Sequence, residues 1–355
     1  MAATNNPMIS GSMASVPHHD PVSSSAFHIA GILTTVYGLD LLPPDTTSVA
    51  VLWLLHPRLQ TQECMAPVAS AAIRHWTSHG SPRQTGLIAV SFDQRNHGSR
   101  LVDTLANEAW RQGNKRHAMD MFSIYHGTAA DTSLLLSYLP AYLFPRNEHT
   151  ITQNLVLGVS LGGHAAWHCL LHEPRITAAV SVIGSPDYQR LMTDRAAKTK
   201  LHSFLASTPP GRDFLGSEDF PRALVEQVEK YDPAGLLLGE LDAVTGNDWE
   251  HEPSDAEKIR LRPILRDRLA GKKILCLSGG KDKLVPYKCG EPFLRWLKSA
   301  SADDGWWKEG RLQVQDVIDP EAGHEFSAMM RQASVEFITR VLAGDTGQEA
   351  RTSKI

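Results

Sequence analysis

The chain has 355 residues, a formal net charge of −4 and a pI near 6.5. This balance gives no electrostatic reason to expect a nucleic acid or an anionic membrane as partner, so we expect a small, roughly neutral substrate. Hydrophobic residues make up 42% of the chain and charged residues 21%. Those fractions exclude disorder across the bulk of the chain and fit one large α/β domain that carries an insertion.

Short, continuous apolar runs recur along the chain, as in strands that are buried on both faces of a parallel sheet. They cover residues 49–55, 86–92, 153–158, 178–183, 273–278 and 312–318. Helical stretches, including 128–142, 163–172 and 292–299, lie between them, and residues 26–42 alternate well enough for one or two antiparallel edge strands. Strands that alternate with helices predict an α/β fold with a doubly wound, mostly parallel sheet.

The strand pattern stops between residues 187 and 271, where charged helical pieces such as 223–231 and 254–269 take over. We interpret 187–271 as a helical cap inserted into a core formed by 27–186 and 272–342. The alternative is a set of surface helices with no role over the site. Long insertions tend to carry function, which favours the cap.

The two ends of the chain read differently. Residues 1–26 lack the apolar core of a secretory signal and predict a flexible tail, and no run of about 18 apolar residues predicts a membrane span. Residues 343–355 are polar and end in Ser353-Lys354-Ile355, which differs from the peroxisomal Ser-Lys-Leu signal only by an isomeric aliphatic residue. We expect the peroxisomal import receptor as a partner and a peroxisomal location, with the cytoplasm as the alternative.

Cofactors and metals find little support in the sequence. The four cysteines are widely scattered and none forms a C-x-x-C pair, which predicts reduced thiols in an intracellular protein. The segment His18-His19-Asp20 lies in the N-terminal tail, and no other cluster has the spacing of metal ligands. We therefore expect no cofactor and no metal.

A possible nucleophile lies in Gly158-Val159-Ser160-Leu161-Gly162, a G-x-S-x-G pattern placed where a buried strand ends and a helix begins. In that context the pattern predicts a nucleophile elbow, a strained turn that lifts the serine hydroxyl clear of the sheet. Its glycines are needed because neighbouring backbones approach too closely for a Cβ atom. Ser160 is the predicted nucleophile.

A serine hydroxyl needs a base that takes its proton, and a histidine base needs an acid that fixes its tautomer. His324 follows the last predicted strand, and Asp282 follows the strand at 273–278, so the chain order is Ser, Asp, His, as in α/β-hydrolases. Each residue has a plainer interpretation, Asp282 as a turn former and His324 as a loop cap. Asp187, which follows the strand at 178–183, is a rival acid that reads equally well as part of a Ser-Pro-Asp turn.

Acyl hydrolysis also needs donors for the tetrahedral oxyanion. One is predicted at the backbone N–H of Leu161, directly after the nucleophile. The second is expected in the loop after an early buried strand, His56-Pro57-Arg58, where Pro57 has no N–H and Arg58 is the candidate. His56-Pro57 also reads as a simple strand-ending turn, and residues 93–100 read chiefly as scaffold.

The motifs together resemble the α/β-hydrolase superfamily over about residues 45–340. The resemblance rests on Leu54-Leu55-His56-Pro57, Asp93-Gln94-Arg95-Asn96-His97-Gly98, the elbow with Gly163-His164, Gly280-Lys281-Asp282 and Gly323-His324. The second and third of these motifs look like a fungal branch of the superfamily. With the Ser-Lys-Ile ending, the chain is similar to the peroxisomal hydrolases of Alternaria host-selective toxin biosynthesis. It departs from the lipase and esterase pattern in having His-Pro where His-Gly is usual.

The sequence therefore predicts a serine hydrolase that cleaves an ester or thioester of a small acyl substrate through Ser160, His324 and Asp282. The resemblance places it in fungal toxin or secondary-metabolite biosynthesis. A lyase or acyltransferase on the same residues stays open, as does a catalytically silent fold that acts as a binding protein.

Overall fold

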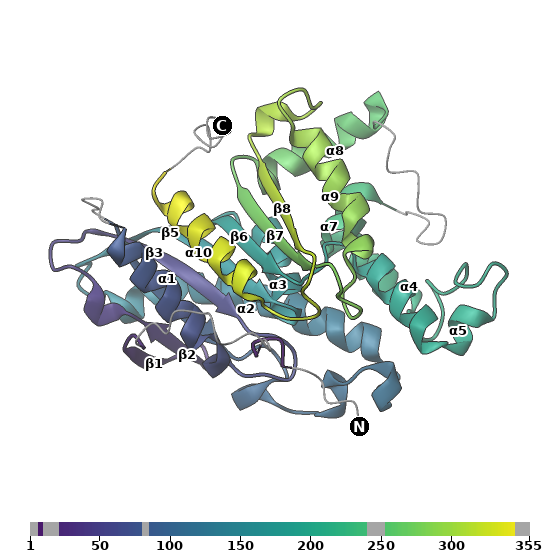
Figure 1. Cartoon of the computed structure of the whole chain (residues 1–355), viewed down its shortest axis with the longest axis horizontal. Coiled ribbons are helices and arrows are strands. Elements are labelled where there is room, and N and C mark those ends of the chain that lie inside the picture. Colours follow the sequence, from purple (N-terminus) through teal and green to yellow (C-terminus); the bar gives the residue numbers. More distant parts are fainter. Residues whose placement is uncertain (1–5, 10–20, 80–84, 240–252, 345–355) are drawn as a thin grey trace.

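The computed structural model describes residues 6–9, 21–79, 85–239 and 253–344. An eight-stranded sheet in the order β1-β2-β4-β3-β5-β6-β7-β8 runs through the centre of the molecule (Figure 1). Its strands are β1 (Ser24–Ile29), β2 (Ile32–Tyr37), β3 (Ser48–Leu55), β4 (Thr85–Phe92), β5 (Thr150–Val159), β6 (Ile176–Val182), β7 (Lys273–Gly279) and β8 (Gln313–Asp319).

The sheet is antiparallel at one end only. β1 pairs with β2 and β2 with β4 in antiparallel register, and every later pair is parallel. In β3 every residue after Ser48 is buried, and in β5 the second half is buried, because helices cover both faces of the sheet there. The prediction of a doubly wound, mostly parallel sheet is confirmed.

Helices flank the sheet on both sides. The longer ones are α1 (Ala66–Ser78), α2 (His117–Leu143), α3 (Leu161–His172), α4 (Tyr188–Thr199), α6 (Arg222–Tyr231), α8 (Asp255–Leu269), α9 (Tyr287–Ser301) and α10 (Ala328–Leu342). α1 and α10 lie side by side on one face (Figure 1). They share one buried apolar cluster with one face of the strands, and the larger cluster on the other face includes residues of α2, α3, α8 and α9.

The predicted strands match the observed ones to within three residues at each end. The helices match less evenly. The stretch predicted at 128–142 is the second half of α2, which begins at His117, and the sequence pattern gives no residue range for α1 or α10. Residues 24–29 and 32–37 form the two antiparallel strands expected at the edge of the sheet.

Between residues 187 and 271 the described residues are helical or irregular. Besides α4, α6 and α8 they hold the short helices α5 (His202–Leu205) and α7 (Pro233–Leu238). α8 lies against α3 through Leu261, Leu265 and Leu269, which are buried in the larger apolar cluster. That residues 187–271 form a cap over the active site remains a prediction.

The two tails are described only in part. Residues 6–9 lie against the C-terminal part of the core, where the N–H of Phe326 and the guanidinium of Arg331 donate to the carbonyl oxygens of Pro7 and Met8. The tripeptide Ser353-Lys354-Ile355, predicted as an import signal, lies outside the described residues. No helix in the described part of the chain is both long and apolar enough to cross a bilayer.

Candidate active site

Ser160 lies in a sharp turn between β5 and α3. Its φ of 56° and ψ of −111° are rare for a residue with a side chain, and this turn geometry is the one expected of a nucleophile elbow. Two backbone hydrogen bonds hold the turn, one from the N–H of Ser160 to Val182 and one from the N–H of His164 to Ser160. The strain at Ser160 is therefore fixed by the sheet below it and the helix after it.

The glycines of the elbow are required by close backbone contacts. A Cβ atom on Gly158 would lie 1.8 Å from the carbonyl oxygen of Gly162, and one on Gly162 would lie 2.1 Å from that of Leu55. Both distances are far below any real Cβ contact, and the obstacles are backbone atoms that cannot rotate away. This agrees with the reason given from the sequence for glycine at these positions.

The structure brings Ser160, His324 and Asp282 together. The hydroxyl of Ser160 lies 2.9 Å from Nε2 of His324, and Nδ1 of His324 lies 2.7 Å from Oδ2 of Asp282. All three residues follow the C-terminal ends of parallel strands, where open α/β sheets place their sites. Ser160 and Asp282 are buried and the side chain of His324 keeps 15% of its surface exposed, so the group lies at the surface of the core.

Hydrogen bonds orient Asp282 and set the tautomer of His324. Oδ1 of Asp282 accepts the N–H groups of Leu284 and Val285, at 2.8 and 2.9 Å, so Oδ2 is left to accept from the histidine ring. With its Nδ1 proton held by Asp282, His324 presents an unprotonated Nε2 to the hydroxyl of Ser160. That is the arrangement in which a histidine can take a proton from serine.

The rival acid, Asp187, has a different part in the structure. It caps the N-terminus of α4, where its carboxylate accepts the N–H of Arg190 and forms an ion pair of 3.3 Å with the Arg190 side chain. Burial raises the pKa of Asp187 to about 6, outweighing the hydrogen bond and the charge of Arg190. It makes no hydrogen bond to His324, so the contacts of the described residues favour Asp282 as the acid.

The two predicted oxyanion donors follow neighbouring strands, Arg58 after β3 and Leu161 after β5. Leu55 of β3 is paired with Gly158 of β5, so the loop that carries Arg58 leaves the sheet beside the turn that carries Leu161. Within the described residues, neither the N–H of Leu161 nor that of Arg58 donates a hydrogen bond. Both N–H groups are therefore free to bind a ligand oxygen.

His56 has a structural part. Its Nδ1 lies 2.8 Å from the carbonyl oxygen of Pro57, and its Nε2 accepts the N–H of Gln94. Burial, the largest cause, lowers its pKa to about 4, which keeps the ring neutral as these hydrogen bonds require. The interpretation of His56-Pro57 as a strand-ending turn fits this geometry.

Residues 93–100 hold neighbouring loops together. The carboxylate of Asp93 accepts the N–H of Gln62 and both the N–H and the hydroxyl of Ser99. Gly98 has a φ of +50°, and a Cβ there would lie 2.3 Å from that carboxylate. The structure thus agrees with a scaffold role for this segment.

Sequence reasoning missed Arg195, which lies on α4. Its guanidinium donates to the carbonyl oxygen of Leu284, two residues from Asp282. An arginine inside a charged amphipathic helix carries no pattern that sets it apart, so only its position in the fold reveals it. The charges of Arg195 and Asp282 are close enough to affect each other.

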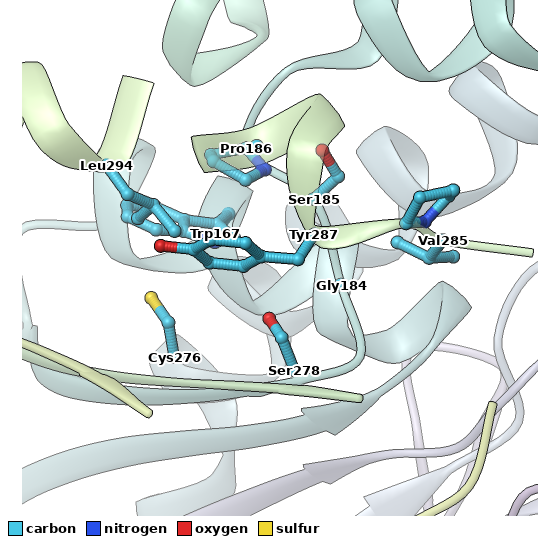
Figure 2. Close-up of a pocket in the computed structure, with 11 residues that line it drawn as sticks. Trp167, Gly184, Ser185, Pro186, Cys276, Ser278, Val285, Tyr287 and Leu294 are labelled. Carbon is cyan, nitrogen blue, oxygen red and sulfur yellow. The ribbon is translucent and has the colours of Figure 1, made fainter. Parts of the chain in front are cut away.

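A small pocket lies near Val285, whose N–H binds Asp282. Figure 2 shows it between Trp167 of α3, Tyr287 of α9 and the strand residues Cys276 and Ser278. It has room for no more than about one water molecule, and none of Ser160, Asp282 and His324 lines it. We therefore do not assign it to the substrate.

Comparisons with known proteins identify the fold. No family model matches the chain, and no curated protein matches it. Among solved structures, TT1662 from Thermus thermophilus is similar over 91% of this chain and 99% of its own length, with 17% identity and a TM-score of 0.51. The esterase Pf2001 from Pyrococcus furiosus is similar over 90% and 92%, with 13% identity and a TM-score of 0.46.

Est1E from Butyrivibrio proteoclasticus is similar over 90% of this chain and 98% of its own, with 14% identity and a TM-score of 0.44. Identities this low say nothing about the reaction that this chain carries out. The eight-stranded, mostly parallel sheet with helices on both sides is similar in fold to TT1662. The chain therefore has the α/β-hydrolase fold.

Proposed function

We propose that the protein is a serine hydrolase that cleaves an ester or thioester of a small acyl substrate. The observation that supports this most directly is the unbroken series of hydrogen-bond distances from Ser160 through His324 to Asp282, at 2.9 and 2.7 Å. A nucleophile, a base and an acid that orients the base are the three groups that acyl transfer to water needs.

In the first step, Oγ of Ser160 attacks the carbonyl carbon and its proton passes to Nε2 of His324. The carbonyl oxygen becomes an oxyanion, which the N–H groups of Leu161 and Arg58 bind. His324 then gives the proton to the leaving alcohol or thiol as the bond to it breaks. The product of this step is an acyl ester on Ser160.

In the second step, a water molecule attacks the acyl ester and His324 takes the water proton. The tetrahedral intermediate collapses, the proton returns to Oγ of Ser160 and the carboxylic acid leaves. The carboxylate of Asp282 stabilises the imidazolium form of His324 in both steps. The two N–H groups that hold Asp282 keep its second oxygen aimed at the ring.

Two alternative functions use the same residues: transfer of the acyl group to an acceptor other than water, and binding without a reaction. An acyltransferase or lyase would use the same nucleophile with another acceptor, and a binding protein would use none of it. The strained turn at Ser160 favours catalysis, because such strain persists at sites where it serves a reaction. A binding protein has no need of it.

The test is a series of p-nitrophenyl esters and acyl-CoA thioesters of increasing chain length, measured with the wild type and with Ser160→Ala. We expect turnover by the wild type and a loss of about 10³-fold or more in the variant. Release of free acid identifies water as the acceptor, whereas a transferred acyl group would identify an acyltransferase. Equal turnover by both proteins would contradict the proposal.

The place of this reaction in the cell is a separate proposal. The resemblance to Alternaria toxin hydrolases supports a role in fungal toxin or secondary-metabolite biosynthesis, and deletion of the gene tests it: unchanged metabolite levels would contradict it. The tripeptide Ser353-Lys354-Ile355 supports import into peroxisomes. A fluorescent protein fused ahead of it should enter peroxisomes and should stay in the cytosol when Ile355 is removed.

A further inference from the structure

Two arginine side chains are linked beside the candidate active site: Nη1 of Arg58 donates to the carbonyl oxygen of Asn107, and His117 lies between the carbonyl oxygen of the next residue, Glu108, and Nη1 of Arg195. Arg58 follows β3 and Arg195 lies on α4. Within the part of the chain that the structure describes, neither guanidinium forms an ion pair, although the chain has more acidic than basic residues. Their neighbours Arg95, Arg100 and Arg190 are all paired with aspartates.

Arg195 is held firmly by neutral partners. Nε and Nη2 donate to the carbonyl oxygen of Leu284, and Nη1 lies 3.2 Å from Nε2 of His117 and 3.0 Å from the sulfur of Met121. These contacts satisfy most of its N–H groups, and the charge of Asp282 acts on Arg195 without forming an ion pair with it. One N–H of Nη2 has no partner among the described residues.

His117 accepts the hydrogen bond from Arg195 only as a neutral ring. Its Nδ1 donates to the carbonyl oxygen of Glu108, which leaves Nε2 unprotonated toward Arg195. Burial, together with the charges of Arg195 and Arg58, holds the pKa of His117 well below its usual value. His117 therefore positions Arg195 without neutralising it.

Arg58 has more free donors than Arg195. Its Nη1 donates to the carbonyl oxygen of Asn107, and a guanidinium has five N–H groups in all. The remaining donors have no partner among the described residues and stay available for a bidentate contact. Carboxylates and phosphates match that planar fork.

The positive charges of Arg58 and Arg195 repel each other in a partly buried environment. Burial lowers the pKa of Arg195 to about 10, and the charge of Arg58 is the next largest cause. Both side chains nevertheless keep part of their surface exposed. The charges of Glu108, near Arg58, and Asp282, near Arg195, offset part of the repulsion between the two arginines, although neither forms an ion pair with them. A bound anion would relieve the rest.

The segments that carry Arg58 and Arg195 contact the elbow and the loop of Asp282, respectively. The chain that leaves β3 passes the elbow so closely that a Cβ on Gly162 would lie 2.9 Å from the carbonyl oxygen of His56, two residues before Arg58. Arg195 holds the carbonyl of Leu284, whose N–H holds Asp282. Both arginines are therefore held by segments that also contact the elbow and Asp282.

We propose that Arg58 and Arg195 form a subsite for an anionic group, a carboxylate or phosphate, on the substrate. The subsite rests on the proposed function, because it gives that hydrolase a substrate class: esters or thioesters that carry a negative charge away from the scissile bond. This differs from the roughly neutral substrate expected from the net charge of the chain. Binding of the anion orients the acyl carbonyl toward Ser160.

The test compares matched charged and neutral substrates. p-Nitrophenyl monoesters of dicarboxylic acids are paired with their methyl-capped diesters, and acyl-CoA is paired with the same acyl N-acetylcysteamine thioester, which lacks phosphates. We expect kcat/KM to favour the charged member of one pair by about tenfold or more, as for a charged hydrogen bond. Preference within the first pair identifies a carboxylate, and within the second a phosphate.

The ratio of the two kcat/KM values should fall toward one in Arg195→Gln and in Arg58→Gln, which keeps its backbone N–H. The control is Arg212→Gln, an exposed arginine paired with Asp213, which should keep the wild-type ratio. Using the ratio removes any general loss of activity. If Arg195→Gln does not fold, Arg58→Gln and the wild-type preference still decide the question.

Binding to Ser160→Ala separates this proposal from the proposed function. By calorimetry, monomethyl glutarate should bind at least about tenfold more tightly than dimethyl glutarate, or CoA more tightly than N-acetylcysteamine, and Arg58→Gln should remove the difference. Equal affinities and equal kcat/KM values would overturn the subsite while leaving the hydrolase intact. Preference for the anion in a protein that hydrolyses nothing would support the subsite and contradict the hydrolase.

Discussion

Oδ2 of Asp282 lies 2.7 Å from Nδ1 of His324, while Oδ1 of the same carboxylate accepts two backbone N–H groups from its own loop. The loop thus fixes the carboxylate and the carboxylate fixes the ring. Replacing Asp282 by Asn keeps the size of the side chain but allows its NH₂ group to face the ring and reverse the tautomer of His324. The direction of every proton transfer depends on that tautomer.

We expect Asp282→Asn to lower kcat by about 10³- to 10⁴-fold with little change in folding. The matched control is Asp187→Asn, which changes the rival acid and should lower kcat by less than about tenfold. Steady-state kinetics of both variants on one ester gives the comparison. A larger loss of kcat in Asp187→Asn than in Asp282→Asn would contradict the assignment of Asp282 as the acid that orients His324.

Asp187 also predicts a dependence of stability on pH. Its pKa is raised to about 6 by burial, above the ordinary value of 3.8, so the folded protein holds this proton more tightly than the unfolded chain. Stability from Asp187 is therefore complete below pH 3.8 and is lost as pH rises toward 6. Relative to the wild type, Asp187→Asn should gain on the order of 2–3 kcal/mol between pH 4 and 7. Urea unfolding at several pH values measures this, and a constant difference between the two proteins would contradict it.

The elbow should not tolerate a single added methyl group. In Gly162→Ala the new Cβ meets the carbonyl oxygen of Leu55 at 2.1 Å, so β3, β5 or the turn must move. We expect a loss of more than about 3 kcal/mol in the free energy of unfolding, or failure to fold. Gly323→Ala is the control for stability, because no atom lies within 4 Å of its added Cβ and its φ is not positive. Similar unfolding midpoints for the two variants would show that the close approach at Gly162 is not required.

Asp131 links the scaffold segment to α2. Its carboxylate, 8% exposed, accepts two N–H groups from Arg95 and one from Arg100. Asp131→Asn removes the buried carboxylate from the exposed Arg95 and the partly buried Arg100, and we expect a loss of about 2–3 kcal/mol in stability. Asp213→Asn, which breaks the exposed pair with Arg212, should leave the unfolding curve unchanged. Equal losses of unfolding free energy in the two variants would mean that burial does not determine how much each ion pair stabilises the protein.

Most of the sheet was predictable because buried parallel strands are continuous apolar runs with polar ends. The triad order was predictable for a related reason: Asp282 comes shortly after the buried strand β7 and His324 shortly after the half-buried edge strand β8, and the ends of parallel strands meet at one edge. Helix boundaries were less predictable. α2 begins at His117, and its first turns bury Ala118, Met121, Phe122 and Tyr125 at helical spacing, a pattern that the range predicted from the sequence, 128–142, leaves out.

The arginine pair could not be predicted from the sequence. Arg58 was singled out for its backbone N–H, and its side chain gave no pattern. Arg195 lies on a helix whose other charged residues face solvent or form local ion pairs, and its burial depends on how α4 lies against the loop at Leu284. Contacts between distant segments of this kind follow from tertiary packing, which local patterns do not encode.

The most direct test of the account is labelling of the purified protein with a neutral fluorophosphonate, followed by peptide mass analysis. The account predicts one phosphonylated residue, Ser160, with labelling abolished in Ser160→Ala and slowed by at least about 10³-fold in His324→Ala. Folded wild-type protein that stays unlabelled, or a label on another residue, would contradict the assignment of Ser160 as the nucleophile.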